Sequence, residues 1–112
     1  MDNKSQIKTV TEILEDKKAE DIIVFDMSER QSVSDFIVIC TANTKVHMRA
    51  IRNSLSKLLR EKAIDKIAES GLLESNWIIM DYGDFLVHLL GKDERTFYSL
   101  EELWKDASVV YH

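Results

Sequence analysis

Two apolar runs separated by a tight turn constrain this chain more than any other stretch. Residues 77–80 and 85–90 are rich in aliphatic, aromatic and β-branched side chains, and they flank the sequence DYGD at 81–84. Apolar runs on either side of a short loop with glycine predict a β-hairpin. A loop of Gly83-Asp84 would form a type II′ turn, and a loop shifted back by one residue would need a type I′ turn. Both registers remain open from the sequence.

The alternation of side chains along a strand divides this hairpin into two faces. One face is almost wholly apolar and is expected to be core: Ile78, Met80, Tyr82, Phe85, Val87 and Leu89. The other face mixes large apolar groups with acids and a histidine: Trp77, Ile79, Asp81, Asp84, Leu86, His88 and Leu90. We expect the apolar face to pack against a helix that carries Met48, Ile51 and Leu55.

Apolar residues at helical spacing predict two helices before the hairpin. The first begins with a cap at Ser5 and runs to about residue 18, and the second and longest covers residues 45–60. Asn43 or Thr44 can cap the second helix. The two apolar stripes consist of Ile7, Val10 and Leu14 in the first helix, and of Met48, Ile51, Leu55, Leu58 and Leu59 in the second.

The remaining segments predict strands, a loop and a last helix. Residues 22–27 and 36–41 are short apolar runs typical of strands, and the second run is apolar on both faces, which favours a central position. Residues 63–68 fit either a helix tail or a short strand. After the hairpin we expect a loop over 90–96 and a helix over 99–106. This order indicates an α/β or α+β fold with a mixed sheet.

Length and composition exclude several classes of protein. The 112 residues suit one domain over 1–112, and the single cysteine, Cys40, suits a reducing compartment. No apolar run approaches the ~20 residues of a membrane span, and the polar N-terminus lacks a signal-peptide core. We therefore expect a cytoplasmic protein. The net charge of −5 argues against non-specific nucleic-acid binding; it agrees with solubility alone or with a basic protein partner.

The titratable residues show no motif for catalysis or metal binding. His47, His88 and His112 lie far apart and outside any metal-ligand motif. His88 could in principle join Asp81 and Asp84 around a cation, but a histidine hydrogen-bonded to a neighbour on a half-covered sheet is favoured. The sequence therefore predicts no metal site and no cofactor.

Three further candidates for chemistry have a plainer structural interpretation. Asp81 and Asp84 could act as paired carboxylates, but aspartate is also a common turn former, which is favoured. Cys40 lies inside an apolar strand and is expected to be an inert thiol. The sequence TANTK at 41–45 precedes a helix, where anions can bind, but helix capping is favoured.

The hairpin and the residues that follow it resemble the Iojap family of ribosomal silencing factors. The family pattern is represented here by Trp77, Asp81 and Asp84, Val87-His88, Glu94-Arg95, Phe97-Tyr98, Leu100-Glu101, Leu103-Trp104 and Asp106-Ala107. The resemblance extends back to about Ile7. Two stretches depart from the family: Ala42-Asn43-Thr44 replaces a Gly-x-Ser-like turn, and the loop before Trp77 is one residue longer.

The resemblance implies a fold and a function. The implied fold is a mixed five-stranded sheet of nucleotidyltransferase-like topology with flanking helices, in which a strand lies near residues 66–69. The implied function is binding of the large ribosomal subunit through ribosomal protein L-fourteen, which blocks subunit association and represses translation under nutrient limitation. No Asp-x-Asp or Gly-Ser pair of true nucleotidyltransferases is present, so an enzyme is not expected.

Aromatic and charged residues of this signature are candidates for partner binding, because Trp, Tyr and Arg are frequent interface anchors. The candidates are Trp77, Asp81, Tyr82, His88, Arg95 and Tyr98. Trp77 fits an exposed anchor or a packing residue equally well. Leu103 and Trp104 are expected to be core. Two alternative functions stay open: a nucleotidyltransferase-type enzyme, and a scaffold that forms a homodimer without contacting the ribosome.

Overall fold

The protein is an α+β fold in which helices cover both faces of one mixed sheet. The computed structural model describes residues 2–29 and 34–111. Its helices are α1 (Asn3–Asp16), α2 (Lys45–Glu61) and α3 (Lys92–Tyr98), with 3-10 turns at η1 (Leu73–Ser75) and η2 (Leu100–Trp104). Its strands are β1 (Glu20–Asp26), β2 (Phe36–Ala42), β3 (Ala68–Leu72), β4 (Trp77–Asp81), β5 (Phe85–Gly91) and β6 (Ser108–Tyr111). None of the described helices is long and apolar enough to cross a membrane.

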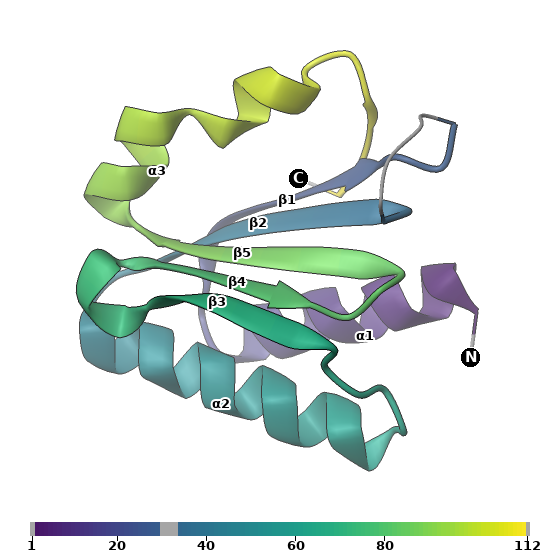
Figure 1. Cartoon of the computed structure of the whole chain (residues 1–112), viewed down its shortest axis with the longest axis horizontal. Coiled ribbons are helices and arrows are strands. Elements are labelled where there is room, and N and C mark those ends of the chain that lie inside the picture. Colours follow the sequence, from purple (N-terminus) through teal and green to yellow (C-terminus); the bar gives the residue numbers. More distant parts are fainter. Residues whose placement is uncertain (1, 30–33, 112) are drawn as a thin grey trace.

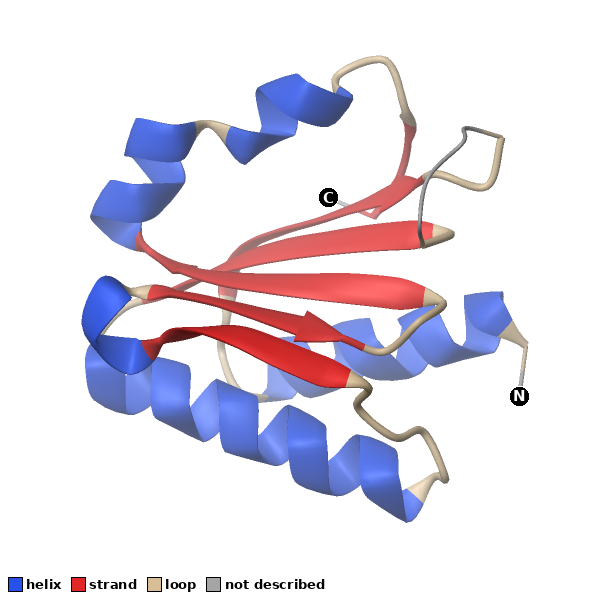
Figure 2. Cartoon of the chain, in the orientation of Figure 1, coloured by secondary structure: helices blue, strands red, loops and turns tan. Residues whose placement is uncertain are grey.

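The strands form one sheet in the order β3-β4-β5-β2-β1-β6. β2 and β5 pair in parallel at its centre, and the other neighbours are antiparallel. Every residue of β2 is buried, which confirms the central position predicted from its apolar character. Helices α1 and α2 cover one face, and the segment from α3 to η2 crosses the other (Figures 1 and 2). We call residues 92–107 the C-terminal arm.

The hairpin of β4 and β5 forms as predicted. Met80 pairs with Val87, and the backbone N–H of Tyr82 donates to the carbonyl of Phe85 at 3.0 Å, so Gly83-Asp84 is the two-residue loop. Gly83 has φ 88° and Asp84 does not have a positive φ, as a type II′ turn requires. The apolar face of the hairpin is buried in one cluster with Met48, Ile51 and Leu55 of α2.

Of the caps predicted for the two long helices, one is correct and one is wrong. Thr44 caps α2, since its hydroxyl accepts from the N–H of His47 at 3.0 Å. The prediction of Ser5 as the cap of α1 is wrong. Asp2 caps this helix, and the N–H of Ser5 donates to its carboxylate at 2.8 Å. Aspartate and serine are both good N-caps. Because α1 begins at Asn3, Asp2 occupies the cap position and Ser5 lies in the first turn, where its N–H needs an acceptor.

The C-terminal part of the chain differs most from the expectation. Residues 92–98 form α3 and not a loop, and the predicted helix over 99–106 is reduced to the 3-10 turn η2. A sixth strand, β6, pairs with β1, so the predicted count of five strands is wrong. Strand β3 exists near the predicted 66–69 but begins two residues later.

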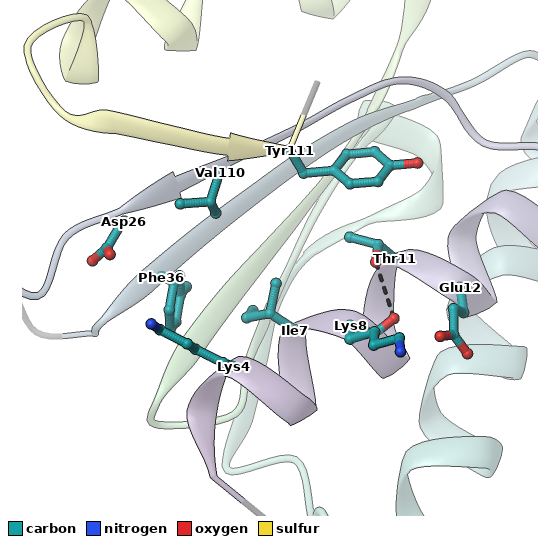
Figure 3. A pocket seen from close by; sticks show the side chains of 9 residues that line it. All are labelled: Lys4, Ile7, Lys8, Thr11, Glu12, Asp26, Phe36, Val110 and Tyr111. Atoms are coloured by element: carbon teal, nitrogen blue, oxygen red, sulfur yellow. Dashed lines mark hydrogen bonds between the residues drawn. The ribbon is translucent and has the colours of Figure 1, made fainter.

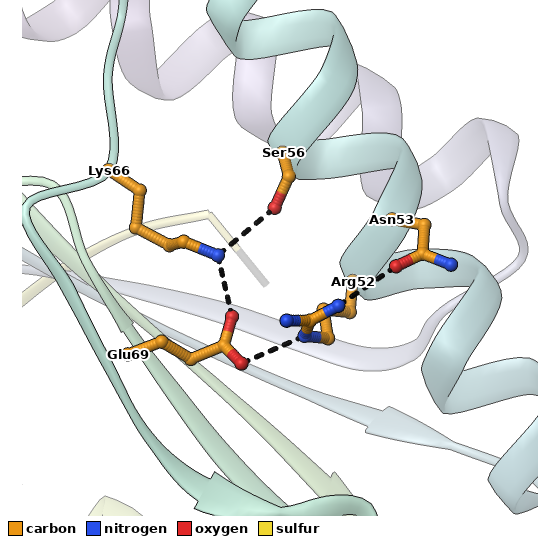
Figure 4. Close-up of polar contacts among 5 residues, drawn as sticks. All are labelled: Arg52, Asn53, Ser56, Lys66 and Glu69. Carbon is orange, nitrogen blue, oxygen red and sulfur yellow. Dashed lines mark hydrogen bonds and ion pairs between the residues drawn. The ribbon is translucent and has the colours of Figure 1, made fainter.

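A polar network joins the edge strand β3 to α2 (Figure 4). Glu69 lies at its centre, and its carboxylate accepts from Arg52 at 2.8 Å and from Lys66 at 2.7 Å. Lys66 also donates to the hydroxyl of Ser56 at 3.4 Å. Burial alone would raise the pKa of Glu69, but the hydrogen bonds from Lys66 and Arg52 lower it overall. The network therefore holds an ionised carboxylate against α2.

Candidate partner-binding surface

A cluster of aromatic rings lies between the sheet and the C-terminal arm. Trp77 of β4 and His88 of β5 sit on the face away from α1 and α2, with ring centroids 6.2 Å apart. The ring of Tyr98 of α3 lies 4.6 Å from that of Trp77, tilted by 47°, and Trp104 of η2 lies 5.9 Å from His88. The rings thus connect strands β4 and β5 to helix α3 and the 3-10 turn η2. Trp77 is partly buried and packs against the apolar cluster on this face of the sheet.

His88 is a neutral acceptor inside this cluster. The indole N–H of Trp77 donates to Nδ1 of His88 at 3.2 Å, so the proton of the neutral imidazole is on Nε2. Only 6% of the His88 surface is exposed. Burial lowers its pKa to about 4. His88 is therefore uncharged near pH 7, in agreement with the hydrogen-bonded interpretation.

Arg95 ties the arm to the sheet. Its Nε donates to Glu101 of η2 at 3.0 Å, and its Nη1 donates to the hydroxyl of Thr41 at 3.0 Å. Only 11% of the Arg95 side chain is exposed. Within the described residues its guanidinium thus joins α3, η2 and β2. This geometry assigns Arg95 a role in positioning the arm.

The arm presents three large apolar side chains to solvent. The exposed fractions are 80% for Phe97, 49% for Tyr98 and 67% for Leu103. We call these three residues the arm patch. Leu100 is buried and Trp104 packs against the core below the arm, so these two occupy the inner positions of η2. The prediction of Leu103 as core is therefore wrong.

The six candidates from the sequence do not form one site. Trp77, His88 and Tyr98 come together, and Arg95 lies nearby on the arm. Asp81 and Tyr82 lie at the other end of β4, where Oδ1 of Asp81 accepts from the N–H of Gly83 at 2.8 Å. Tyr82 is only 6% exposed and stacks on Phe85 on the opposite face of the sheet. Asp81 thus acts as the turn former that its position suggested.

The other candidates for chemistry are engaged in structural roles. Within the described residues, no group of three or more His, Cys, Asp or Glu side chains could hold a metal ion. His47 accepts from the N–H of Asn43 at 2.9 Å, and its other ring nitrogen lies 2.7 Å from the carbonyl of Lys17. Cys40 is fully buried, and burial raises the pKa of its thiol to about 12. His112 lies outside the described residues.

Comparison with known proteins decides the family. Residues 1–111 match the family described as "Ribosomal silencing factor during starvation". The chain belongs to the RsfS family. It is 34% identical over 110 residues to ribosomal silencing factor RsfS of Halalkalibacterium halodurans, an alignment that covers 98% of this chain and 94% of the relative. This result confirms the resemblance inferred from residues 77–107.

Two further similar proteins extend the comparison. A crystal structure of a Chromobacterium violaceum protein superposes with a TM-score of 0.87 at 32% identity, covering 94% of this chain and 88% of that one. An Iojap-related mitochondrial protein of Arabidopsis thaliana is 36% identical, covering 95% of this chain and 61% of the relative. The RsfS family is one of silencing factors and not of enzymes, in agreement with the prediction of no catalytic activity.

Sequence reasoning missed two residues of the arm patch as surface candidates. Phe97 and Leu103 belong to the signature, but a phenylalanine or a leucine at near-helical spacing normally indicates core. The available signal was the acidic start of α3, where Asp93 and Glu94 suit a helix N-terminus. A helix that begins there buries none of its residues, so Phe97 and Tyr98 are exposed to solvent.

Proposed function

We propose that this protein silences the ribosome by covering a surface of the large subunit. In this proposal it binds ribosomal protein L-fourteen and blocks joining of the small subunit, which represses translation when nutrients are limiting. Membership of the RsfS family supports the silencing role. The bacterial relatives support a cytoplasmic location, although the Iojap-related plant protein is named as mitochondrial.

The arm patch is the observation that carries the docking part of the proposal. Large apolar side chains at 49–80% exposure cost free energy in water unless a partner covers them. The arm that carries them is attached to the sheet, because Tyr98 packs on Trp77 and Arg95 donates to Thr41. Aromatic residues held in place before binding are typical of interface hot spots, since little conformational entropy is lost on binding.

The charge of the protein supports a basic partner. The net charge is −5, and the arm carries more acidic than basic side chains: Asp93, Glu94, Glu101, Glu102 and Asp106 against Lys92, Arg95 and Lys105. Glu101 is paired with Arg95, so the other four acids are the candidates for contact with a partner. Acidic groups around an apolar centre give the polar rim that steers a basic protein to a docking site. Such rim charges act mainly on the association rate, so added salt should slow binding.

The test is inhibition of subunit association with titrated protein, followed by light scattering, beside direct sedimentation with each isolated subunit. A protein that works by occupancy should sediment with the large subunit, saturate near one copy per subunit and need no nucleotide. Inhibition at far less than stoichiometric amounts would instead favour the nucleotidyltransferase-type alternative. A protein that dimerises without sedimenting with either subunit would favour the scaffold alternative.

A further inference from the structure

A cleft lies between α1 and the β6 edge of the sheet, on the face opposite the C-terminal arm (Figure 3). Its volume is about 590 Å³, within the range of small-molecule sites. Ile7 and Thr11 of α1 form one wall, and Phe36, Val110 and Tyr111 form the other. Most of these side chains are apolar, so the interior suits a hydrocarbon.

Tyr111 closes the cleft at one end. Its hydroxyl donates to the carboxylate of Glu15, so a residue of β6 is attached to α1 across the opening. Val110 is 51% exposed, and its methyl groups face the space that Ile7 and Phe36 also border (Figure 3). The cleft is therefore a defined space with a closed end and an open rim.

The rim of the cleft is basic on the side of α1. Lys4 and Lys8 are exposed and one helical turn apart, and neither forms an ion pair with a carboxylate of the described residues. Asp26, on the opposite rim, accepts from the N–H and the hydroxyl of Ser28 at 2.9 and 2.6 Å. These hydrogen bonds and, to a smaller extent, the positive charge of Lys4 lower the pKa of Asp26. Glu12 lies a further turn along α1.

We propose that this cleft binds a fatty-acid-like aliphatic monocarboxylate. The hydrocarbon chain would lie on Ile7, Phe36 and Val110, and the carboxylate would lie between Lys4 and Lys8. Two ammonium groups on one wall, neither held in an ion pair with a carboxylate of the described residues, favour an anionic head group. The nearby carboxylates of Asp26 and Glu12 penalise a second negative charge on that head group, which favours a carboxylate over a phosphate monoester.

The test uses decanoate as the probe and the amide spectrum of the ¹⁵N-labelled full chain at pH 7, below the micelle-forming concentration. Decanoate should shift the amide signals of Ile7, Thr11, Val110 and Tyr111. Decanol should bind more weakly, and decyltrimethylammonium most weakly, because it places a cation beside the lysines. The proposal is overturned if decanoate leaves these signals unchanged, shifts the arm patch instead, or binds no better than the cationic probe.

Two variants separate the head-group and chain contributions. The double substitution Lys4→Gln and Lys8→Gln should weaken decanoate by about tenfold and leave decanol unchanged. The matched control is Lys57→Gln with Lys62→Gln, two exposed lysines of the α2 region, which should change neither ligand. Val110→Trp, at a half-exposed position, should fill the cleft and abolish binding of both. Equal decanoate affinity in the Lys4/Lys8 and control variants, or unchanged binding by folded Val110→Trp, overturns the assignment.

Discussion

Trp77 donates its indole N–H to Nδ1 of His88 across the pair of strands that the hairpin turn connects. The two residues are diagonal neighbours, because Trp77 pairs with Leu90 and His88 pairs with Ile79. The bond exists only with a neutral imidazole, since a protonated Nδ1 would place two donors against each other. The packing of Trp77 under Tyr98 therefore depends on the charge state of a buried residue.

The first prediction is a loss of stability at mildly acidic pH. His88 has a pKa of about 4 in the folded protein and about 6.5 when unfolded. Between these values only the unfolded chain takes up the proton, so the free energy of unfolding should fall as the pH falls below 6.5. The loss should reach on the order of 3 kcal/mol and be complete below pH 4. Urea unfolding at a series of pH values measures it.

A matched variant isolates this contribution from the other titrating groups. In His88→Asn, the side-chain oxygen can accept the Trp77 bond in place of Nδ1, but the residue does not titrate. The difference in the free energy of unfolding between the wild type and the variant should therefore change with pH only between about 4 and 6.5. A constant difference over this range would show that His88 does not carry the effect.

The second prediction concerns the core beneath the hairpin. Phe85 is 1% exposed and lies in the cluster that joins β5 to α2, so Phe85→Ala should lower the free energy of unfolding by roughly 3–5 kcal/mol. Val46→Ala is the control, because Val46 is 73% exposed and should change stability by no more than about 0.5 kcal/mol. Chemical denaturation of both variants measures the difference. Similar midpoints for the two would contradict the assignment of this face to the core.

The hairpin and the long helices could be predicted because their signals are local. Alternation in residues 77–90 and the spacing of Met48, Ile51 and Leu55 reflect burial along one element. Strand β6 has no such signal. It has four residues, three of which are exposed, and its place is decided by pairing with β1. Helix α3 buries no residue, so periodicity could not reveal it.

The candidate site was predictable as a set of residue types but not as an arrangement. Trp77, His88 and Tyr98 belong to one cluster because the arm folds back over the sheet, a tertiary event with no trace in local spacing. Alternation already placed Tyr82 on the opposite face from Trp77, and the structure agrees. The family signature therefore combines residues of the hairpin turn, the core and the surface.

The third prediction is that Arg95 holds the arm in place. Arg95→Gln removes two hydrogen bonds from a side chain that is 11% exposed, and should lower the free energy of unfolding by about 1–3 kcal/mol. Hydrogen exchange of amides 92–104 should accelerate more than exchange in β4 and β5.

Two substitutions control this prediction. Arg95→Lys should not restore the wild-type exchange, because an ammonium cannot reproduce the two directions of the guanidinium. Lys92→Gln is the matched surface change. It removes an ion pair at 3.8 Å with Glu20 between largely exposed groups and should cost no more than about 1 kcal/mol. Arm exchange that is equal in Arg95→Gln and Lys92→Gln would show that the tether does not order the arm.

The fourth prediction concerns docking through the arm patch. Phe97→Ala and Leu103→Ala remove side chains that are 80% and 67% exposed, so both variants should keep the stability of the wild type. If the large subunit covers the arm patch, each substitution should weaken binding to that subunit by about tenfold or more. The reason is that truncating an apolar anchor at the centre of an interface commonly costs over 1 kcal/mol of binding free energy.

Matched controls decide whether such a loss belongs to the interface. Val46→Ala removes a side chain of similar exposure from α2, on the opposite face of the sheet, and should bind normally. Trp77→Ala should lose both stability and binding, because the ring of Trp77 supports Tyr98 at 4.6 Å and also donates to His88. Sedimentation with large subunits, beside thermal unfolding of each variant, separates the two effects. Wild-type binding by folded Phe97→Ala and Leu103→Ala would place the contact surface elsewhere on the molecule.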